Sequence, residues 1–199
     1  RSCNLENLKK LENTVLNFQL LELVLLVKLN GYSIKGKIMN INSTKQRNFV
    51  VHKFGGTSVA NSDRYKGVAE IMTTNLHLTD KNNSKIQTGV KAIVVSAMSK
   101  VTDALIELTN LAKNRDEKYL SQLEVLYQKH IQAVQELLTE ENDLLNTIKS
   151  DFEDIKEILR GLWLIQSASM QAVELVSGYG EVWSAQILNA YLQKLGKKS

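Results

Sequence analysis

The sequence predicts an α/β fold with a largely parallel sheet, and three segments carry that prediction. Two short runs, residues 50–52 and 91–96, are rich in β-branched residues, which is typical of strands buried in a parallel sheet. Between them, apolar residues recur at helical spacing, namely Tyr65, Val68, Ala69, Met72 and Leu76. A strand, a helix and a second strand in this order form a βαβ unit, whose crossover is nearly always right-handed.

The first strand ends in a turn that suits an anion. Lys53-Phe54-Gly55-Gly56-Thr57-Ser58 combines a lysine, adjacent glycines and two hydroxyl residues, and Asn61, Ser62 or Asp63 is expected to cap the next helix. Glycines let backbone N–H groups approach a phosphate, and a helix N-terminus adds partial positive charge. The motif is not a Walker loop, and similar glycine pairs occur in ordinary strand–helix turns. Taken alone, it leaves a phosphate site and a simple turn both open.

The remaining chain is predicted to be mainly helical. Thr79–Gly89 is polar and is expected to form a loop before the second strand. Helical stripes follow in residues 101–113, 120–138 and 145–162, with a break near residues 139–143. The last two stripes predict an antiparallel helical pair that covers the sheet. The chain has no proline, which agrees with long uninterrupted helices.

The C-terminal part is expected to contain two helical segments. Ser177-Gly178-Tyr179-Gly180-Glu181 separates them, so that the last segment is Val182–Leu195 and Glu181 opens it. The chain then reaches Gly196–Ser199, where another buried strand is expected. Because two strands cannot complete an α/β sheet, we expect the fold to be truncated at its C-terminus.

Composition excludes several classes of site. The formal net charge is +4, but residues 1–48 hold eight basic and three acidic residues, so the remainder carries −1 and no nucleic-acid surface is predicted. The single cysteine, Cys3, excludes an internal disulfide and a cysteine cluster for zinc. The three histidines, His52, His77 and His130, lie far apart and are predicted to be structural or solvated.

Residues 1–48 are predicted to be a leader or upstream extension outside the fold. The apolar run Phe18–Leu29 is too short for a bilayer, which needs about 20 apolar residues. Glu22 inside the run and the lack of a small-residue cleavage site argue against a signal peptide. We interpret Met39 as the start of the protein, which would leave residues 1–38 upstream of it. No membrane partner is predicted.

Three polar clusters could converge on one site. They are Lys53–Ser58, Ser96–Asp103 and Gly178–Glu181, each at a strand's carboxyl end or at a helix start. Open α/β sheets bind ligands at such positions. Each cluster also has a purely local interpretation, because Ser96–Asp103 fits a loop with a helix cap and an acidic residue such as Glu181 is favourable in a first helical turn.

Together the clusters resemble the motifs of aspartate kinases, which are members of the amino-acid kinase superfamily. Lys-Phe-Gly-Gly-Thr-Ser-Val at residues 53–59 is similar to their signature, and the likeness continues through Val95–Asp103 and Gly180–Ala185, in the family's order. The middle motif and the helical insert, with Arg115-Asp116 and Tyr119-Leu120-Ser121, look most like bifunctional aspartokinase–homoserine dehydrogenases. The resemblance covers residues 49–199. It implies the N-terminal portion of a catalytic domain folded as a three-layer sandwich with a helical insert.

The resemblance also implies an activity. This is ATP-dependent phosphorylation of the β-carboxylate of L-aspartate, the first step of lysine, threonine, methionine and isoleucine biosynthesis, with Mg²⁺ accompanying ATP. The implied catalytic residues are Lys53, Gly55 and Gly56. The implied ATP-binding residues are the same three with Phe54 and Ser58, and the implied aspartate-binding residues are Thr102, Glu181 and Ser96.

Two positions depart from the family pattern, and several expectations reach beyond the chain. Tyr179 stands where many relatives carry histidine, and Asp103 where asparagine is frequent in bacterial members. The nucleotide-base pocket and further catalytic residues are expected beyond Ser199, so the isolated chain is expected to be inactive. The full-length enzyme is expected to be a homo-oligomer, to use NADP only if a downstream dehydrogenase domain exists, and to be cytoplasmic, or plastidic if its source is a plant or alga.

Two alternatives remain open at this point. One is another amino-acid kinase, acting on glutamate or acetylglutamate. The other is a non-catalytic fragment whose helical insert serves as an interaction module.

Overall fold

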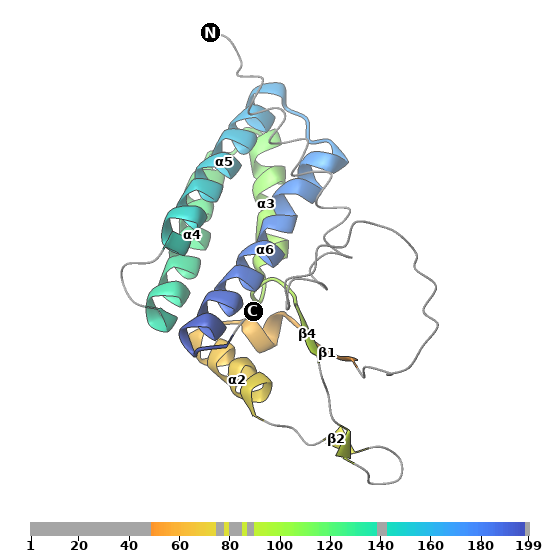
Figure 1. Ribbon diagram of the computed structural model, residues 1–199. Coiled ribbons are helices and arrows are strands. Elements are labelled where there is room, and N and C mark those ends of the chain that lie inside the picture. Colours follow the sequence, from red (N-terminus) through yellow and green to blue (C-terminus); the bar gives the residue numbers. More distant parts are fainter. Residues whose placement is uncertain (1–48, 75–77, 80–84, 87–89, 139–142, 198–199) are drawn as a thin grey trace, which may run out of the picture. The chain divides into compact units, whose positions relative to one another are not determined.

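The computed structural model describes residues 49–74, 78–79, 85–86, 90–138 and 143–197 (Figure 1). The predictions for residues 1–48, including Phe18–Leu29 and Met39, therefore lie outside the described residues, as do Leu76 and His77. The chain divides into two compact units. One contains the strands up to Lys53 and from Thr74 to Val94, and the other contains Phe54–Thr73 and Val95–Lys197.

The strands among the described residues form two small sheets. β1 (Phe49–Phe54) pairs with β4 (Val90–Val95), while β2 (Leu78–Thr79) and β3 (Lys85–Ile86) pair antiparallel. The N–H of Ser96, just after β4, donates to the carbonyl of Phe54 at the end of β1, 3.1 Å away. The carboxyl ends of β1 and β4 therefore lie together, as in a parallel pair. The predicted α/β class with a parallel sheet is confirmed.

The polar segment Thr79–Gly89 was expected to be a loop, and the short β2–β3 hairpin corrects that prediction. Leu78 lies opposite Ile86, and Thr79 opposite Lys85. Strands of two residues are too short to carry a readable alternation of apolar and polar side chains. The hairpin therefore depends on pairing between segments that periodicity alone cannot detect.

The other unit is helical. Its described residues form the 3₁₀ turn η1 (Gly56–Val59) and five α-helices, which are α2 (Ser62–Thr73), α3 (Val101–Lys113), α4 (Lys118–Leu137), α5 (Asp143–Ile165) and α6 (Met170–Lys194). The bounds of α3 are those predicted, and the Asn61 side chain caps α2 by accepting from the Arg64 N–H at 3.0 Å. α3 packs against α4, α5 and α6 (Figure 1). It is thus the central helix of this unit.

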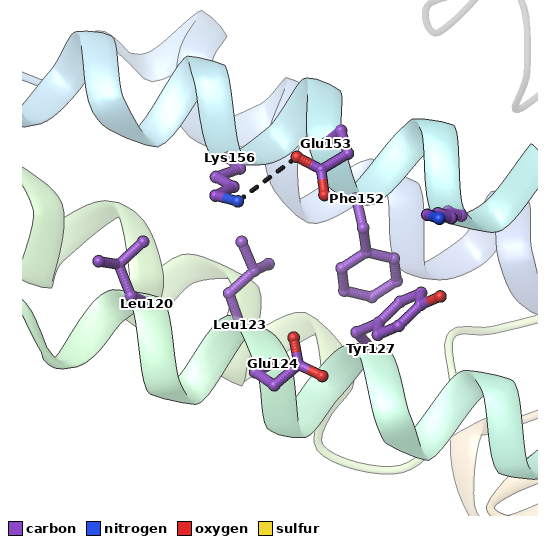
Figure 2. Close-up of a pocket in the computed structure, with 8 residues that line it drawn as sticks. Leu120, Leu123, Glu124, Tyr127, Phe152, Glu153 and Lys156 are labelled. Atoms are coloured by element: carbon purple, nitrogen blue, oxygen red, sulfur yellow. Dashed lines mark hydrogen bonds and ion pairs between the residues drawn. The ribbon is translucent and has the colours of Figure 1, made fainter.

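α4 and α5 form the predicted antiparallel pair. Figure 2 shows Phe152 of α5 beside Tyr127 of α4, and Lys156, one turn further along α5, beside the earlier α4 residue Leu123. The buried stripes of the two helices contact each other, α3 and α6. We expected the stripes to cover the sheet, whereas they bury one another in a helical bundle. A stripe shows that a helix has an apolar face but does not identify the surface that covers it.

Trp183 of α6 lies in the core of the bundle, where its side chain is completely buried. Its ring stacks on Phe152 with centroids 4.3 Å apart, and the His130 ring meets it edge-on at 4.8 Å. The indole N–H donates to Oδ2 of Asp151 at 3.0 Å, so the one polar atom of this ring is satisfied. These contacts join α4, α5 and α6 at a single point.

The C-terminal helix differs from the prediction. α6 runs without a break from Met170 to Lys194, so Ser177–Glu181 does not separate two segments and Glu181 is not in a first helical turn. A glycine inside a helix costs about 1 kcal/mol relative to alanine, which packing contacts can outweigh. Gly180 has such a contact, because a Cβ built on it would lie 2.9 Å from Cβ of Ala97. The glycine permits close packing here and does not end the helix.

In the described part of the chain, none of the helices has the long uncharged apolar stretch that crossing a membrane requires.

Candidate active site

A cleft of about 410 Å³ lies where the segment after β4 enters α3. It brings together residues from all three predicted clusters, all of them within the helical unit. The lining residues are Gly56, Thr57, Ser96, Ala97, Met98, Ser99, Lys100, Thr102, Asp103 and Glu181. Segments that are up to 125 positions apart in the sequence therefore meet at one site.

One wall of the cleft is the loop Ser96–Lys100, in which the backbone turns sharply before α3 begins. Lys100 has φ 64° and ψ 6°, a left-handed conformation that turns the chain into α3. The Val101 N–H donates to the Met98 carbonyl at 2.9 Å. The preceding N–H groups, those of residues 97–100, have no hydrogen-bond acceptor among the described residues. Successive free N–H groups at a left-handed turn and a helix N-terminus form a site suited to an anion.

α6 contributes a negatively charged side chain to the cleft. Glu181 is half-buried, and its Oε1 lies 3.4 Å from Oγ1 of Thr102, which donates to it. Asp103, in the first turn of α3, adds a second and exposed carboxylate to the lining. A carboxylate beside a set of N–H donors can hold a molecule that carries both an ammonium and a carboxylate group.

Two glycines bring the surrounding elements close to this loop. A Cβ on Gly56 would lie 2.8 Å from the Ala97 carbonyl oxygen, and one on Gly180 would lie 2.9 Å from the Ala97 Cβ and 3.1 Å from Cγ1 of Val101. No side chain fits at either position without a shift. The loop is therefore held between η1 and α6, which places Glu181 next to Thr102.

The other members of the first cluster occupy different places. Phe54, Gly55 and Ser58 do not line the cleft, and the Ser58 N–H donates to the Gly55 carbonyl at 2.9 Å inside the turn. Lys53 is exposed near the end of β1 and belongs to the other compact unit. Its place relative to the cleft stays a prediction.

Sequence reasoning missed one residue at this site, Lys129 of α4. Its Nζ donates to the Ser99 carbonyl at 2.7 Å. Partial burial, and secondarily the charge of Lys100, lowers the pKa of Lys129 below its ordinary 10.5. No motif includes Lys129, and it lies 30 positions after Ser99, so no local signal could have identified it.

Among the described residues, His, Cys, Asp and Glu side chains do not gather in groups of three or more that could hold a metal ion.

A second and smaller pocket, of about 140 Å³, lies between α4 and α5 (Figure 2). Phe152, Tyr127 and Leu123 form its floor, and Lys156 and Glu153 pair at 3.5 Å on its rim with exposed side chains. Apolar packing below and solvated charges above are typical of a groove between two helices.

Known proteins resemble this chain in sequence. The profile of the amino acid kinase family matches residues 48–199. A bifunctional aspartokinase/homoserine dehydrogenase 2 from Arabidopsis thaliana, named as chloroplastic, is 36% identical over 169 residues, which cover 84% of this chain and 17% of that protein. The corresponding enzyme 1 from Zea mays, also named as chloroplastic, is 37% identical over 148 residues, which cover 73% of this chain and 15% of that protein. The chain thus spans only a small part of the length of these relatives.

Solved structures agree on the fold. The crystal structure of E. coli aspartokinase III in complex with aspartate and ADP (R-state) superposes with a TM-score of 0.61 and 23% identity, over 75% of this chain and 30% of that one. The aspartate kinase of Clostridium acetobutylicum gives a TM-score of 0.51 at 22% identity. The resemblance to bifunctional aspartokinase–homoserine dehydrogenases, predicted from the middle motif and the helical insert, is confirmed by the curated relatives. Because the family profile matches residues 48–199, this chain belongs to the amino acid kinase family.

Proposed function

We propose that residues 49–199 are the N-terminal portion of an aspartate kinase catalytic domain, with the cleft beside α3 as its aspartate site. The observation that carries this proposal is that one cleft combines the carboxylate of Glu181 with the backbone N–H groups of residues 97–100, which have no acceptor among the described residues. L-Aspartate carries one ammonium and two carboxylates, which match these two kinds of partner. The E. coli enzyme with a similar fold was crystallised with aspartate and ADP, which supports the same ligand class here.

The lining residues then take distinct roles. Glu181 accepts from the substrate ammonium, and Thr102 turns its hydroxyl from Glu181 toward the substrate carboxylate when the ligand enters. Ser96 adds a hydroxyl at the same mouth. These groups orient aspartate so that its β-carboxylate oxygen can attack the terminal phosphorus of ATP.

The remaining residues serve the phosphates of ATP. In this proposal the N–H groups of Gly55 and Gly56 support the transferring phosphoryl group, and Lys53 neutralises charge that develops in the transition state. Phe54 and Ser58 are the other proposed ATP-binding residues. Phosphoryl transfer requires positioning and charge stabilisation more than covalent chemistry. Mg²⁺ bound to ATP supplies further neutralisation of the phosphate charge.

The wider setting belongs to the same proposal. The product, 4-phospho-L-aspartate, would enter the biosynthesis of lysine, threonine, methionine and isoleucine. The names of the curated relatives support linkage to a homoserine dehydrogenase and a plastid location. NADP would be used only by such a downstream dehydrogenase domain. The homo-oligomeric state remains a prediction, as does the assignment of residues 1–48 to a leader or upstream extension outside the fold.

The test uses the natural gene product that contains this chain. With ATP, Mg²⁺ and L-aspartate it should form aspartyl phosphate, which hydroxylamine traps as the hydroxamate. Glu181→Gln should raise the KM for aspartate by about 10- to 100-fold, since it removes the charge opposite the substrate ammonium. Glu174→Gln is the matched control, because Glu174 is an exposed residue of the same helix.

Three outcomes would contradict the proposal. An unchanged aspartate KM in Glu181→Gln would remove Glu181 from the site. Preferential phosphorylation of glutamate or acetylglutamate would favour another amino-acid kinase. Absence of ATP binding, together with stable self-association on gel filtration, would favour the helical interaction module.

A further inference from the structure

Lys129 connects the helical bundle to the loop that lines the cleft. It projects from α4 beside the completely buried His130, so the helix backbone at this point is fixed by the core. Its half-buried side chain ends at the Ser99 carbonyl, with Nζ donating over 2.7 Å. A hydrogen bond from an ammonium to a carbonyl is shorter and stronger than one between neutral groups. α4 thereby contacts the loop through a directed bond.

The loop needs an external partner at Ser99 because of its own geometry. If the α3 helix continued back through residue 100, the Ser99 carbonyl would accept from the N–H of Asp103. Instead, the backbone of Lys100 adopts the left-handed conformation, with φ 64°. As a result, neither the Asp103 N–H nor any other described backbone N–H donates to the Ser99 carbonyl. A left-handed non-glycine residue is unfavourable by itself and persists only where its surroundings hold it. Lys129 supplies a donor at the peptide that this strained turn exposes.

This bond also sets the direction of a donor in the cleft. In a trans peptide, the N–H of Lys100 points opposite to the carbonyl of Ser99. Lys129 fixes that carbonyl, and therefore fixes the Lys100 N–H, which has no acceptor among the described residues. The bond brings two ammonium groups into the same neighbourhood, and the lowered pKa of Lys129 reflects this as well as its burial. A lysine in solvent would avoid both unfavourable effects, so its inward position requires a compensating contact.

We propose that Lys129 is a positioning residue for the aspartate site, which holds the Ser96–Lys100 loop so that its N–H groups are directed at the substrate carboxylate before it binds. The inference rests on the proposed function, since that identifies the substrate. Lys129 touches neither substrate nor ATP and acts through the Ser99 peptide.

Two measurements on the natural gene product test this inference, with Lys129→Met as the main variant. The first is amide hydrogen exchange without substrate, followed at Val101 and Ala104, whose N–H groups donate to the loop carbonyls of Met98 and Lys100. Their exchange should accelerate about tenfold in the variant. The second is steady-state kinetics, in which the aspartate KM should rise about tenfold while kcat and the KM for ATP stay within about twofold.

Two further variants separate positioning from a general loss of stability. Lys129→Arg keeps a cationic donor and should restore most of the aspartate affinity. Lys156→Met removes an exposed lysine of α5 whose partner is Glu153, and should change neither exchange nor KM. If Lys129→Met does not fold, Lys129→Gln replaces it in both measurements.

Unchanged exchange at Val101 and Ala104, or an unchanged aspartate KM, would each overturn the role of Lys129. Equal effects of Lys129→Arg and Lys129→Met would also overturn it, since a cationic donor would then not matter. If the unmodified protein forms no aspartyl phosphate, the proposed function fails by that result alone. The exchange measurement would still decide whether Lys129 orders the loop.

Discussion

Because Gly180 has no side chain, α6 can pack closely enough to position a residue of the site. It is buried in α6, and its backbone approaches Ala97 and Val101 so closely that a Cβ would lie 2.9 Å and 3.1 Å from their side chains. The next residue is Glu181, whose carboxylate meets Thr102. The same contact that excludes a side chain at residue 180 therefore brings the carboxylate into the cleft.

A pair of glycine substitutions tests this interpretation. Gly161→Ala in α5 should raise the free energy of unfolding by about 0.5–1 kcal/mol, because a Cβ there meets no atom within 4 Å and alanine is the better helix former. Gly180→Ala should lower it by about 1–3 kcal/mol, because α6 must move away from Ala97. Urea unfolding of both variants measures the difference. A stabilising Gly180→Ala would show that the loop yields without strain.

At the scale of elements, α6 joins the bundle to the cleft and begins at a specific cap. The Ser169 hydroxyl accepts from the Ala172 N–H at 3.2 Å, which satisfies one of the free donors at the helix start. Trp183, in the second half of the same helix, holds it against α4 and α5. Because α6 is continuous, the packing of Trp183 in the core also determines the position of Glu181.

Ser169→Ala tests the cap. It should lower the free energy of unfolding by about 1 kcal/mol, since it leaves the Ala172 N–H without its side-chain acceptor. Ser167→Ala, at an exposed position two residues earlier, should change stability by less than about 0.5 kcal/mol. Thermal unfolding of the two variants provides the comparison. Equal shifts in Tm would mean that α6 starts independently of Ser169.

At the scale of the whole molecule, stability should depend on pH through the core. His130 is completely buried among Phe152 and Trp183, its Nδ1–H donates to the Leu126 carbonyl at 2.7 Å, and its Nε2 has no partner among the described residues. Burial lowers the pKa of His130 from 6.5 to about 4, more than the bond to Leu126 raises it. Below pH 6.5 the His130 imidazole is protonated in the unfolded chain, whereas in the folded chain it is protonated only below about pH 4. Stability that is fully present above pH 6.5 is therefore lost as the pH falls through this window.

The size of this loss can be measured. The difference between the two pKa values corresponds to about 3 kcal/mol, so urea midpoints should decrease between pH 7 and pH 4. In His130→Phe the decrease should be shallower, because the remaining titrating groups are the same and the buried imidazole is gone. Parallel pH profiles for the two proteins would show that His130 does not titrate in this range.

The sequence by itself determined the local elements and the motifs. The bounds of α3, the break between α4 and α5, the Asn61 cap and the two paired strands all follow from periodicity, β-branched runs and capping residues. These signals are local, because they depend on neighbouring residues and on the geometry of one helix or strand. The three polar clusters were also readable, and Gly56, Ser96, Thr102 and Glu181 from them do line one cleft.

Only the tertiary structure decided the rest. It made α6 a single helix through Gly178 and Gly180, placed the stripes of α4 and α5 against α3 and each other, and brought Lys129 to the Ser99 carbonyl. Helix propensities differ by about 1 kcal/mol or less for most residues, so packing between distant segments overrides them. The contact between Lys129 and Ser99 joins residues 30 positions apart. It produces no periodic pattern in the sequence, because its geometry arises only when separate elements pack together.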